Sequence, residues 1–267
     1  MTVFFNLLVL ITPDNNYFRA ALKAAELVDK ERGCIHLVYV INREKGAMLN
    51  KGLEIADTIK KTLLKKQSRL NINTIAFTDD KRRSILNQYM QDKKIDLIIK
   101  LNKSQSQINI FFSRLLWKKG NAEHLSCNVL YLHKKSLGHV IKSILIPITN
   151  NNIPKEKLSL AAAIARDNHA RIHLLATTGP DGNSGEIMEG FYHAYKTLLL
   201  CGFDVQYQLV SYGYSDKKIF AYAAESNTDL LLMDYVQKRK LSNIFRTPIQ
   251  YLLKNAGIYP VNILFVK

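Results

Sequence analysis

The fold is decided by one stretch of sequence that occurs twice in the chain. Residues 7–39 read LLVLITPDNNYFRAALKAAELVDKERGCIHLVY, and residues 144–176 read ILIPITNNNIPKEKLSLAAAIARDNHARIHLLA. The two stretches align without a gap and share the run IHL, at 35–37 and 172–174, and most of the other apolar positions match in character. Self-similarity over this length indicates a duplicated structural unit.

The similarity continues to the end of the chain, and the alignment shifts by only a few positions on the way. Asp96-Leu97 matches Asp229-Leu230, and the sequence NVLY at 128–131 matches NILF at 262–265. A repeat that keeps its register over this length is large enough to be a domain. We therefore predict one domain at residues 1–135 and a second at 140–267, joined by a linker at about 134–139.

Each repeat alternates strand and helix patterns. In the second repeat, apolar strand patterns occur at 143–149, 171–176, 205–210, 230–233 and 261–266. Helical patterns follow Pro154 and span 187–201, 216–225 and 244–256. Strands that alternate with helices form mainly parallel sheets with helices on both faces. The sequence therefore predicts an α/β protein of two tandem Rossmann-like domains, each with a five-stranded, mainly parallel sheet.

The composition is that of a globular protein with an excess of positive charge. The chain is 47% hydrophobic and has a formal net charge of +16. Residues 1–137 carry 24 Lys and Arg against 12 Asp and Glu, a net charge of +12. Such charge favours polyanions or acidic membranes, but the lysines are interleaved with acids, which favours an ordinary solvated surface. No apolar run reaches the ~18 residues of a membrane span, and we expect residues 3–11 to form a strand and not a signal peptide.

Ligands of doubly wound sheets lie at the carboxyl ends of the strands. The candidate ligand-binding residues of the second repeat are Thr149 after its first strand, Asp234 after its fourth, and Arg246 and Thr247 at the start of its last helix. In the first repeat, Lys100 ends a buried strand, where a lysine is expected to extend to solvent, with an anion contact as the alternative. Glycine-rich phosphate-binding patterns are absent, and the glycines of 179–185 have the wrong place and spacing.

The histidines and cysteines show no catalytic or metal-ligand spacing. His36 and His173 occupy equivalent strand positions, and we expect each to point to a helix-covered face or to pack with a satisfied hydrogen bond. Cys34, Cys127 and Cys201 are far apart, and we expect buried apolar residues. We predict neither catalytic residues nor a metal site.

Several segments resemble the universal stress protein family. They are Leu8–Thr12 (LVLIT), Asp229–Met233 (DLLLM) and the closing segment Tyr259–Lys267 (YPVNILFVK). In the first repeat, Asp96–Lys100 and His124–Val129 are similar to the E-type tandem members. The resemblance covers nearly the whole chain. It implies an adenine nucleotide alpha hydrolase-like fold and a cytoplasmic, non-enzymatic role in stress response or regulation.

Nucleotide-binding members of that family have an aspartate after the first strand and Gly-x-x-Gly-x9-Gly-Ser/Thr after the fourth. Thr12 and Thr149 stand in the place of the aspartate, and Asp234, Gln237 and Thr247 stand at about the glycine positions of the second repeat. Both repeats thus depart from the nucleotide pattern, which argues against a bound ATP cofactor. The hypothesis is a regulatory protein with degenerate nucleotide sites. The alternatives are an ATP-binding signalling module that uses the second domain, or a polyanion- or nucleic-acid-binding protein.

The closing strands suggest how the domains assemble. Asn128–His133 and Asn262–Lys267 are apolar and would be edge strands in isolated domains. Exposed apolar edges favour strand pairing, and the family's dimers pair in this way. We predict that the two segments pair with each other or with a second chain.

Overall fold

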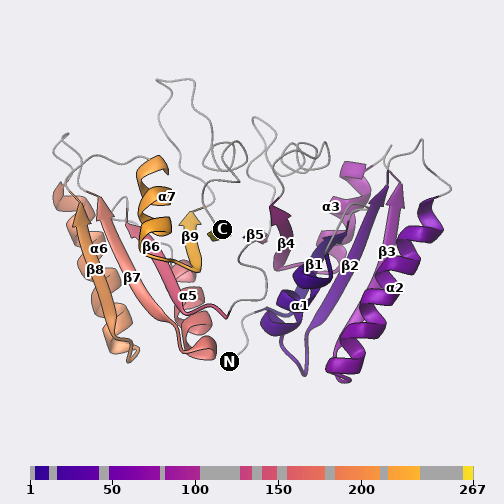
Figure 1. Cartoon of the computed structure of the whole chain (residues 1–267). Helices are drawn as coiled ribbons and strands as arrows, with labels where there is room; N and C mark the ends of the chain where they lie inside the picture. The colour runs from indigo at the N-terminus through magenta and orange to yellow at the C-terminus, as the bar shows by residue number, and fades with distance from the viewer. Residues whose placement is uncertain are drawn as a thin grey trace. The chain divides into compact units, whose positions relative to one another are not determined.

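The computed structural model describes residues 4–11, 17–41, 48–78, 82–102, 127–133, 140–148, 155–177, 184–210, 216–234 and 261–266. These residues divide into two compact units. The first contains strands β1 to β5 and the second contains strands β6 to β10 (Figure 1).

The first unit is a parallel α/β sheet. Its elements are β1 Asn6–Ile11, α1 Tyr17–Leu27, β2 Cys34–Ile41, α2 Met48–Lys66, β3 Asn71–Thr78, α3 Arg82–Asp92, β4 Leu97–Asn102 and β5 Asn128–His133. The strand order is β3-β2-β1-β4-β5, and β1 pairs in parallel with both β2 and β4. Helices α1 and α2 cover one face and α3 the other (Figure 1).

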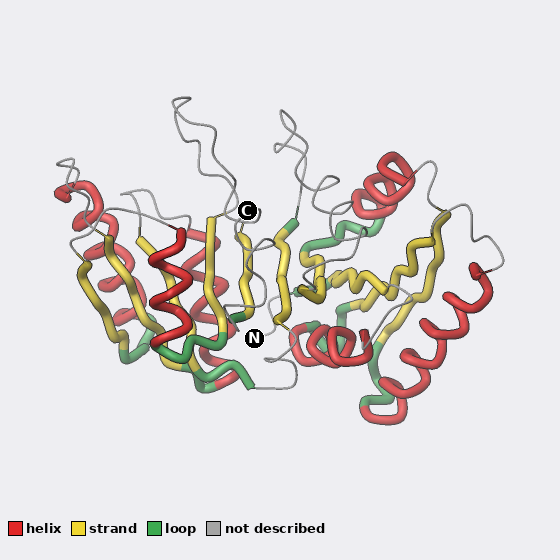
Figure 2. Tube along the Cα trace, turned by 45° about the horizontal axis from the view of Figure 1, so that its top comes forward, coloured by secondary structure: helices red, strands yellow, loops and turns green. Residues whose placement is uncertain are grey.

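The second unit repeats this arrangement. Its elements are β6 Ser143–Ile148, α5 Lys155–Asn168, β7 Arg171–Thr177, α6 Ser184–Leu200, β8 Val205–Val210, α7 Asp216–Glu225, β9 Leu230–Asp234 and β10 Asn262–Val266. The strand order is β10-β9-β6-β7-β8, and the adjacent strands pair in parallel. The strands of each unit run side by side between their helices (Figure 2).

The strand register confirms the duplication residue by residue. Leu8 of β1 lies opposite His36 of β2, and Leu145 of β6 lies opposite His173 of β7. These are the residues that the gapless alignment of the two repeats makes equivalent. The predicted fold of two tandem Rossmann-like units is therefore confirmed. The helix predicted at 244–256 and the linker at 134–139 lie outside the described residues, and the domain bounds and the pairing of the closing strands stay predictions.

Sequence and packing agree in the core of each unit. The strands are apolar on both sides because helices cover both faces, and residues 7–11 of β1 and 144–148 of β6 are fully or almost fully buried. Small residues let the helices approach closely: a Cβ at Gly52 of α2 would lie 2.1 Å from the Tyr39 ring of β2. Tyr39, which is 1% exposed, therefore packs into space that only glycine leaves open.

At the amino ends of the first unit's strands, one aspartate joins three strands. The Asp96 Oδ2 atom accepts hydrogen bonds from the backbone N–H groups of Phe5 at 2.7 Å and Asn6 at 3.2 Å. The Asp96 carbonyl accepts from the Asn128 backbone N–H at 2.9 Å and from its Nδ2 at 3.3 Å. Burial raises the pKa of Asp96, while the backbone donors act in the opposite direction.

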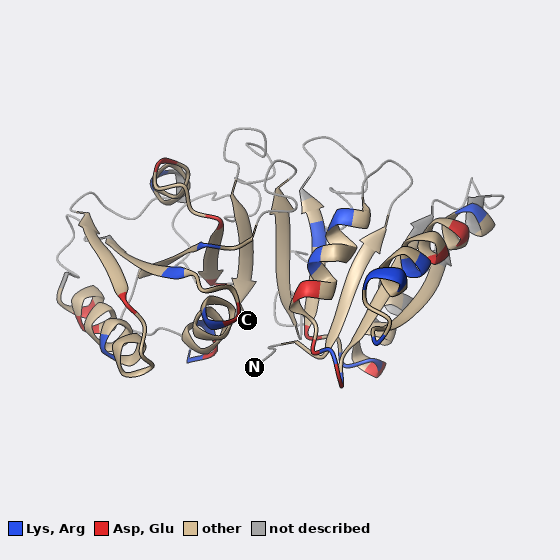
Figure 3. Cartoon of the chain, turned by 60° about the horizontal axis from the view of Figure 1, so that its bottom comes forward, with Lys and Arg blue, Asp and Glu red and all other residues tan. Residues whose placement is uncertain are grey.

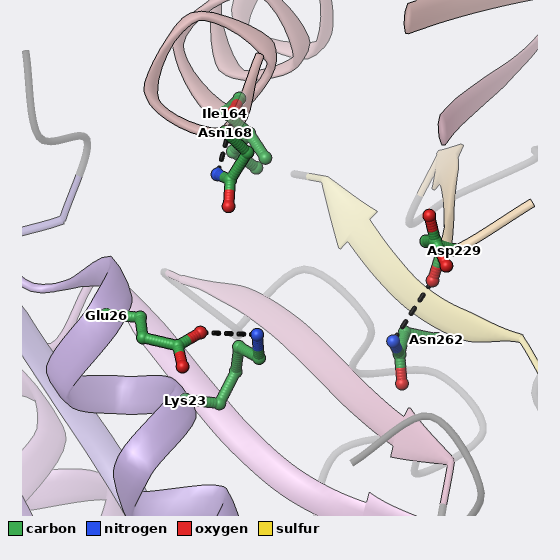
Figure 4. Close-up of polar contacts among 6 residues, drawn as sticks. All are labelled: Lys23, Glu26, Ile164, Asn168, Asp229 and Asn262. Atoms are coloured by element: carbon green, nitrogen blue, oxygen red, sulfur yellow. Dashed lines mark hydrogen bonds and ion pairs between the residues drawn. The ribbon is translucent and has the colours of Figure 1, made fainter. Parts of the chain in front are cut away.

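The second unit has the same arrangement. The Asp229 Oδ2 atom accepts from the backbone N–H groups of Lys142 at 2.8 Å and Ser143 at 3.0 Å. The Asn262 side chain donates from Nδ2 to the Asp229 carbonyl at 3.0 Å (Figure 4). Asp96 with Asn128 and Asp229 with Asn262 are thus equivalent pairs, one in each copy of the repeat.

Candidate functional site

In the second unit, the strand order reverses between β6 and β9. The chain passes from β6 to β7 on one side and later returns to β9 on the other. Their ladder pairs Ile144 with Leu230 and Leu145 with Leu231, and Pro147 and Asp234 lie beyond it toward the carboxyl ends. This is the position at which doubly wound sheets bind ligands.

A buried ion pair occupies this position. Lys157 is the third residue of α5, and its side chain is only 2% exposed. Its Nζ atom lies 3.1 Å from Asp234 Oδ2 and 3.2 Å from the Pro147 carbonyl oxygen, and it donates to both. The other carboxylate oxygen, Asp234 Oδ1, is buried and has no hydrogen-bond donor among the residues that the structure describes.

The electrostatics of the pair follow from its burial. Loss of solvent lowers the pKa of Lys157, and the charge and hydrogen bond of Asp234 partly raise it again. A charged group without a partner here would be costly, so each residue depends on the other. Sequence reasoning found Asp234 and missed Lys157, because a lysine on an amphipathic helix is ordinarily exposed. The repeat could have revealed Lys157, because the gapless alignment makes it equivalent to Ala20, a small residue.

The first unit has no charge at the equivalent positions. Ala20 stands where the second unit has Lys157, and Leu101 stands where it has Asp234; both are buried. The buried cation at this end of the first unit's sheet is instead Lys100 of β4, which is 4% exposed, with its Nζ 5.5 Å from the centroid of the Tyr131 ring. Burial lowers the pKa of Lys100 to about 7. The prediction that Lys100 extends to solvent is therefore wrong, because its side chain is buried next to the Tyr131 ring of β5.

Of the four predicted ligand-binding residues, the structure describes only Asp234. Thr149, Arg246 and Thr247 lie outside the described residues, as does Thr12 of the first repeat. The proposed grouping of the four thus stays a prediction. What the structure adds is Lys157, which contacts Asp234 directly.

Of the two histidines only His36 is packed as predicted, and its Nε2 atom is buried without a hydrogen-bond partner among the described residues; His173 is half-buried. His36 is 2% exposed, and its Nδ1 atom lies 2.7 Å from the Tyr89 hydroxyl of α3. Burial lowers its pKa to about 4, so the ring is neutral at physiological pH. His173 contacts the Gln206 side chain of β8.

The cysteines differ from the prediction at one position. Cys34 and Cys127 are buried, but Cys201, which directly follows the last turn of α6, is exposed. Burial raises the pKa of the Cys34 thiol, which keeps it protonated. No group of three or more His, Cys, Asp or Glu side chains that could hold a metal ion occurs in the described parts of the chain.

Solved structures with the same fold extend over the whole chain. A universal stress protein from Archaeoglobus fulgidus DSM 4304 aligns with 97% of this chain and 96% of its own, at 13% identity and a TM-score of 0.64. A protein from Pseudomonas aeruginosa UCBPP-PA14 assigned to the universal stress proteins covers 99% and 93% of the two chains, at 18% identity and a TM-score of 0.65. The chain has the fold of the universal stress proteins.

The universal stress protein fold is not confined to proteins with that name. The cytoplasmic domain of a prokaryotic cation chloride cotransporter aligns with 98% of this chain and 95% of its own, at 10% identity and a TM-score of 0.61. No family profile and no curated protein matches the sequence. Among the described helices, none is long and apolar enough to cross a bilayer. Because one fold serves several functions, the function must be argued from the residues at the strand ends.

Proposed function

We propose that the chain is a non-enzymatic, cytoplasmic regulatory protein of the tandem universal stress protein type, whose nucleotide sites are degenerate. The observation that carries the proposal is the Lys157–Asp234 ion pair at the carboxyl ends of β6 and β9. It stands where ligands of this kind of sheet bind, and its chemistry is unsuited to a polyphosphate.

Phosphate-binding loops present free backbone N–H groups, usually from glycines, to the anion. Here β9 ends in the carboxylate of Asp234, which repels phosphate, and the ammonium of Lys157 already donates to that carboxylate and to the Pro147 carbonyl. In the first unit the equivalent strand presents the apolar side chain of Leu101 and a lysine, Lys100, whose pKa is lowered to about 7. Neither unit thus offers a strong, permanent positive charge at these residues.

The protonation of Cys34 and His36, the buried residues that could act as nucleophile and base, supports the proposal that the chain is not an enzyme. Burial keeps Cys34 as a thiol, and a thiol is a poor nucleophile. His36 is neutral and engaged by the Tyr89 hydroxyl beneath α3. Neither residue lies at the carboxyl ends of the strands, since Cys34 begins β2 and His36 is its third residue.

A polyanion-binding role is the second candidate, and it rests on the net charge of +12 in residues 1–137. The long helix α2 carries five lysines, with the acids Glu54 and Asp57 among them in its first half (Figure 3). Such mixed charge weakens a polyanion contact. Retention on DNA that falls steeply with salt would favour this candidate.

Calorimetry with Mg-ATP tests the leading proposal. We expect no affinity tighter than about 100 μM, which corresponds to roughly 5.5 kcal/mol, and no release of ADP or phosphate over hours. A saturable, low-micromolar signal that Arg246→Ala and Thr247→Val abolish would favour the ATP-binding alternative instead.

A further inference from the structure

The Asp234 carboxylate is satisfied on one side only. Oδ2 accepts from Lys157, whereas Oδ1 is buried and has no donor among the residues described. A buried acceptor without a donor costs free energy that the same carboxylate would not lose in water. The atom lies at the end of β9, beyond the ladder between β6 and β9, where ligands of such sheets bind.

The fold does not need this ion pair. The first unit forms the same sheet with Ala20 and Leu101 at the equivalent positions, and both are buried. Buried ion pairs are often no more stabilising than well-packed apolar residues of similar volume. Asp96 at the amino ends also has one buried oxygen, Oδ1, without a donor among the described residues, so the unsatisfied oxygen alone does not mark a site. What distinguishes Asp234 is that its ion pair stands in only one of two equivalent units and at the carboxyl ends of the strands, which is better explained by a ligand than by stability.

We propose that the second unit binds an uncharged small molecule through a hydroxyl or amino group that donates a hydrogen bond to Asp234 Oδ1. The Lys157–Asp234 ion pair indicates that the ligand is uncharged. An anionic group would be repelled by the carboxylate, and a cationic group would compete with Lys157 for it. A neutral donor satisfies Oδ1 and leaves the ion pair intact. The inference deepens the proposed function, because it names the ligand class of the same site.

The first experiment asks whether the pair is structural. The variant Lys157→Met/Asp234→Leu replaces it with apolar side chains of similar size. We expect its urea midpoint to equal or exceed that of the natural chain. The control is Glu26→Gln, which removes one partner of another buried lysine, Lys23 in α1 (Figure 4). A clear fall in the midpoint of the double variant, with the control unchanged, would show that the pair is needed for folding and overturn the proposal.

The second experiment tests the ligand class with matched probes. Ribose, cytidine and nicotinamide are neutral donors, and ribose 5-phosphate, cytidine monophosphate and nicotinate are their anionic counterparts. The ¹H–¹⁵N signals of β6 and β9 report binding. We expect at least one neutral probe to give saturable shifts, its anionic counterpart to bind at least tenfold more weakly, and the double variant to lose the response. Glu26→Gln should keep it.

The proposal fails if no neutral probe shifts these signals, if the anionic probes bind equally well, or if the response survives in the double variant. These outcomes are distinct from failure of the proposed function, which tight binding or turnover of ATP would show. A chain that binds neither ATP nor any neutral probe would contradict this inference alone.

Discussion

The two units agree at the amino ends of their strands and differ at the carboxyl ends. At the amino ends, Asp96 and Asp229 each accept two backbone hydrogen bonds at the start of the unit's first strand. At the carboxyl ends, the first unit has Ala20 and Leu101 where the second has Lys157 and Asp234. The hydrogen bonds that hold the sheet together are thus the same in both copies, while the residues at the ligand-binding end of the fold are not.

The difference indicates where the chemistry of each unit lies. A sheet tolerates different residues at its carboxyl ends because its ladder is already complete there: β6 and β9 are paired only up to Leu145 and Leu231. The amino ends have less freedom, since three strands meet at one aspartate. Variants at matched positions of the two units can therefore separate residues that hold the fold from residues that serve a ligand.

The largest effect is expected at the amino ends. Asp96→Ala and Asp229→Ala each remove the acceptor of two backbone N–H groups, and each should lower the free energy of unfolding by about 3 kcal/mol. Urea unfolding checks both. Asp→Asn at either position is the control, because it keeps one acceptor and should lose less. A loss in only one unit would contradict the equivalence of the two aspartates.

Breaking the ion pair should have the next largest effect. Lys157→Ala leaves Asp234 without its donor, and because that carboxylate is 19% exposed we expect a loss of about 2 kcal/mol, below the value for a fully buried pair. The same residue, alanine, is accommodated at this place in the first unit. Glu26→Gln, at a half-exposed partner, should cost less than about 1 kcal/mol. Equal losses for the two variants would remove the distinction between them.

We expect the free energy of unfolding to depend on pH through Lys100. Its pKa is about 7 in the folded chain and near 10.5 when the chain is unfolded, so between these values the unfolded state binds the extra proton. Stability should therefore rise from pH 7 to pH 10.5, by at most about 1.4 kcal/mol per pH unit from this group, and fall as the pH is lowered through the same range.

Lys100→Met removes this contribution. Methionine should fit, because Met233 occupies the equivalent position of the second unit and is buried. The difference in unfolding free energy between variant and natural chain should favour the variant most at about pH 7 and shrink as the pH rises toward the unfolded pKa. A difference that does not change with pH would show that the lysine remains charged in the folded chain.

The fold could be predicted from the sequence because two independent patterns agreed. Buried strands gave continuous apolar runs, and the repeat fixed which runs are equivalent; β8 and α7 have the predicted bounds, Val205–Val210 and Asp216–Glu225. The candidate site was predicted only in part. Asp234 was found because it follows a recognisable strand, whereas Lys157 was not, since helical periodicity does not reveal whether a long side chain turns inward.

Two other errors have the same origin. Lys100 was expected to reach solvent and Cys201 to be buried, and the structure shows the reverse for both. Residue type gives a tendency toward the surface or the core, but the actual burial depends on what neighbouring elements cover. Lys100 is buried next to the Tyr131 ring of β5, whereas the end of α6 is open to solvent, with its last residue, Leu200, 81% exposed.

The smallest expected effect on stability concerns a tyrosine that both units have, on the helix after the third strand. Tyr89 of α3 and Tyr222 of α7 are equivalent in the same alignment that matches Asp96 with Asp229. The Tyr89 hydroxyl lies 2.7 Å from Nδ1 of His36, whereas His173 contacts Gln206 instead.

Tyr89→Phe leaves a buried histidine nitrogen without a partner and should cost about 1 kcal/mol. Tyr222→Phe breaks no hydrogen bond that the described residues show and should cost less than about 0.5 kcal/mol. Urea unfolding of the two variants, with the His36 ring followed by NMR, is the measurement. If Tyr222→Phe proved as costly as Tyr89→Phe, the two histidines would be held alike, and this difference between the units would be lost.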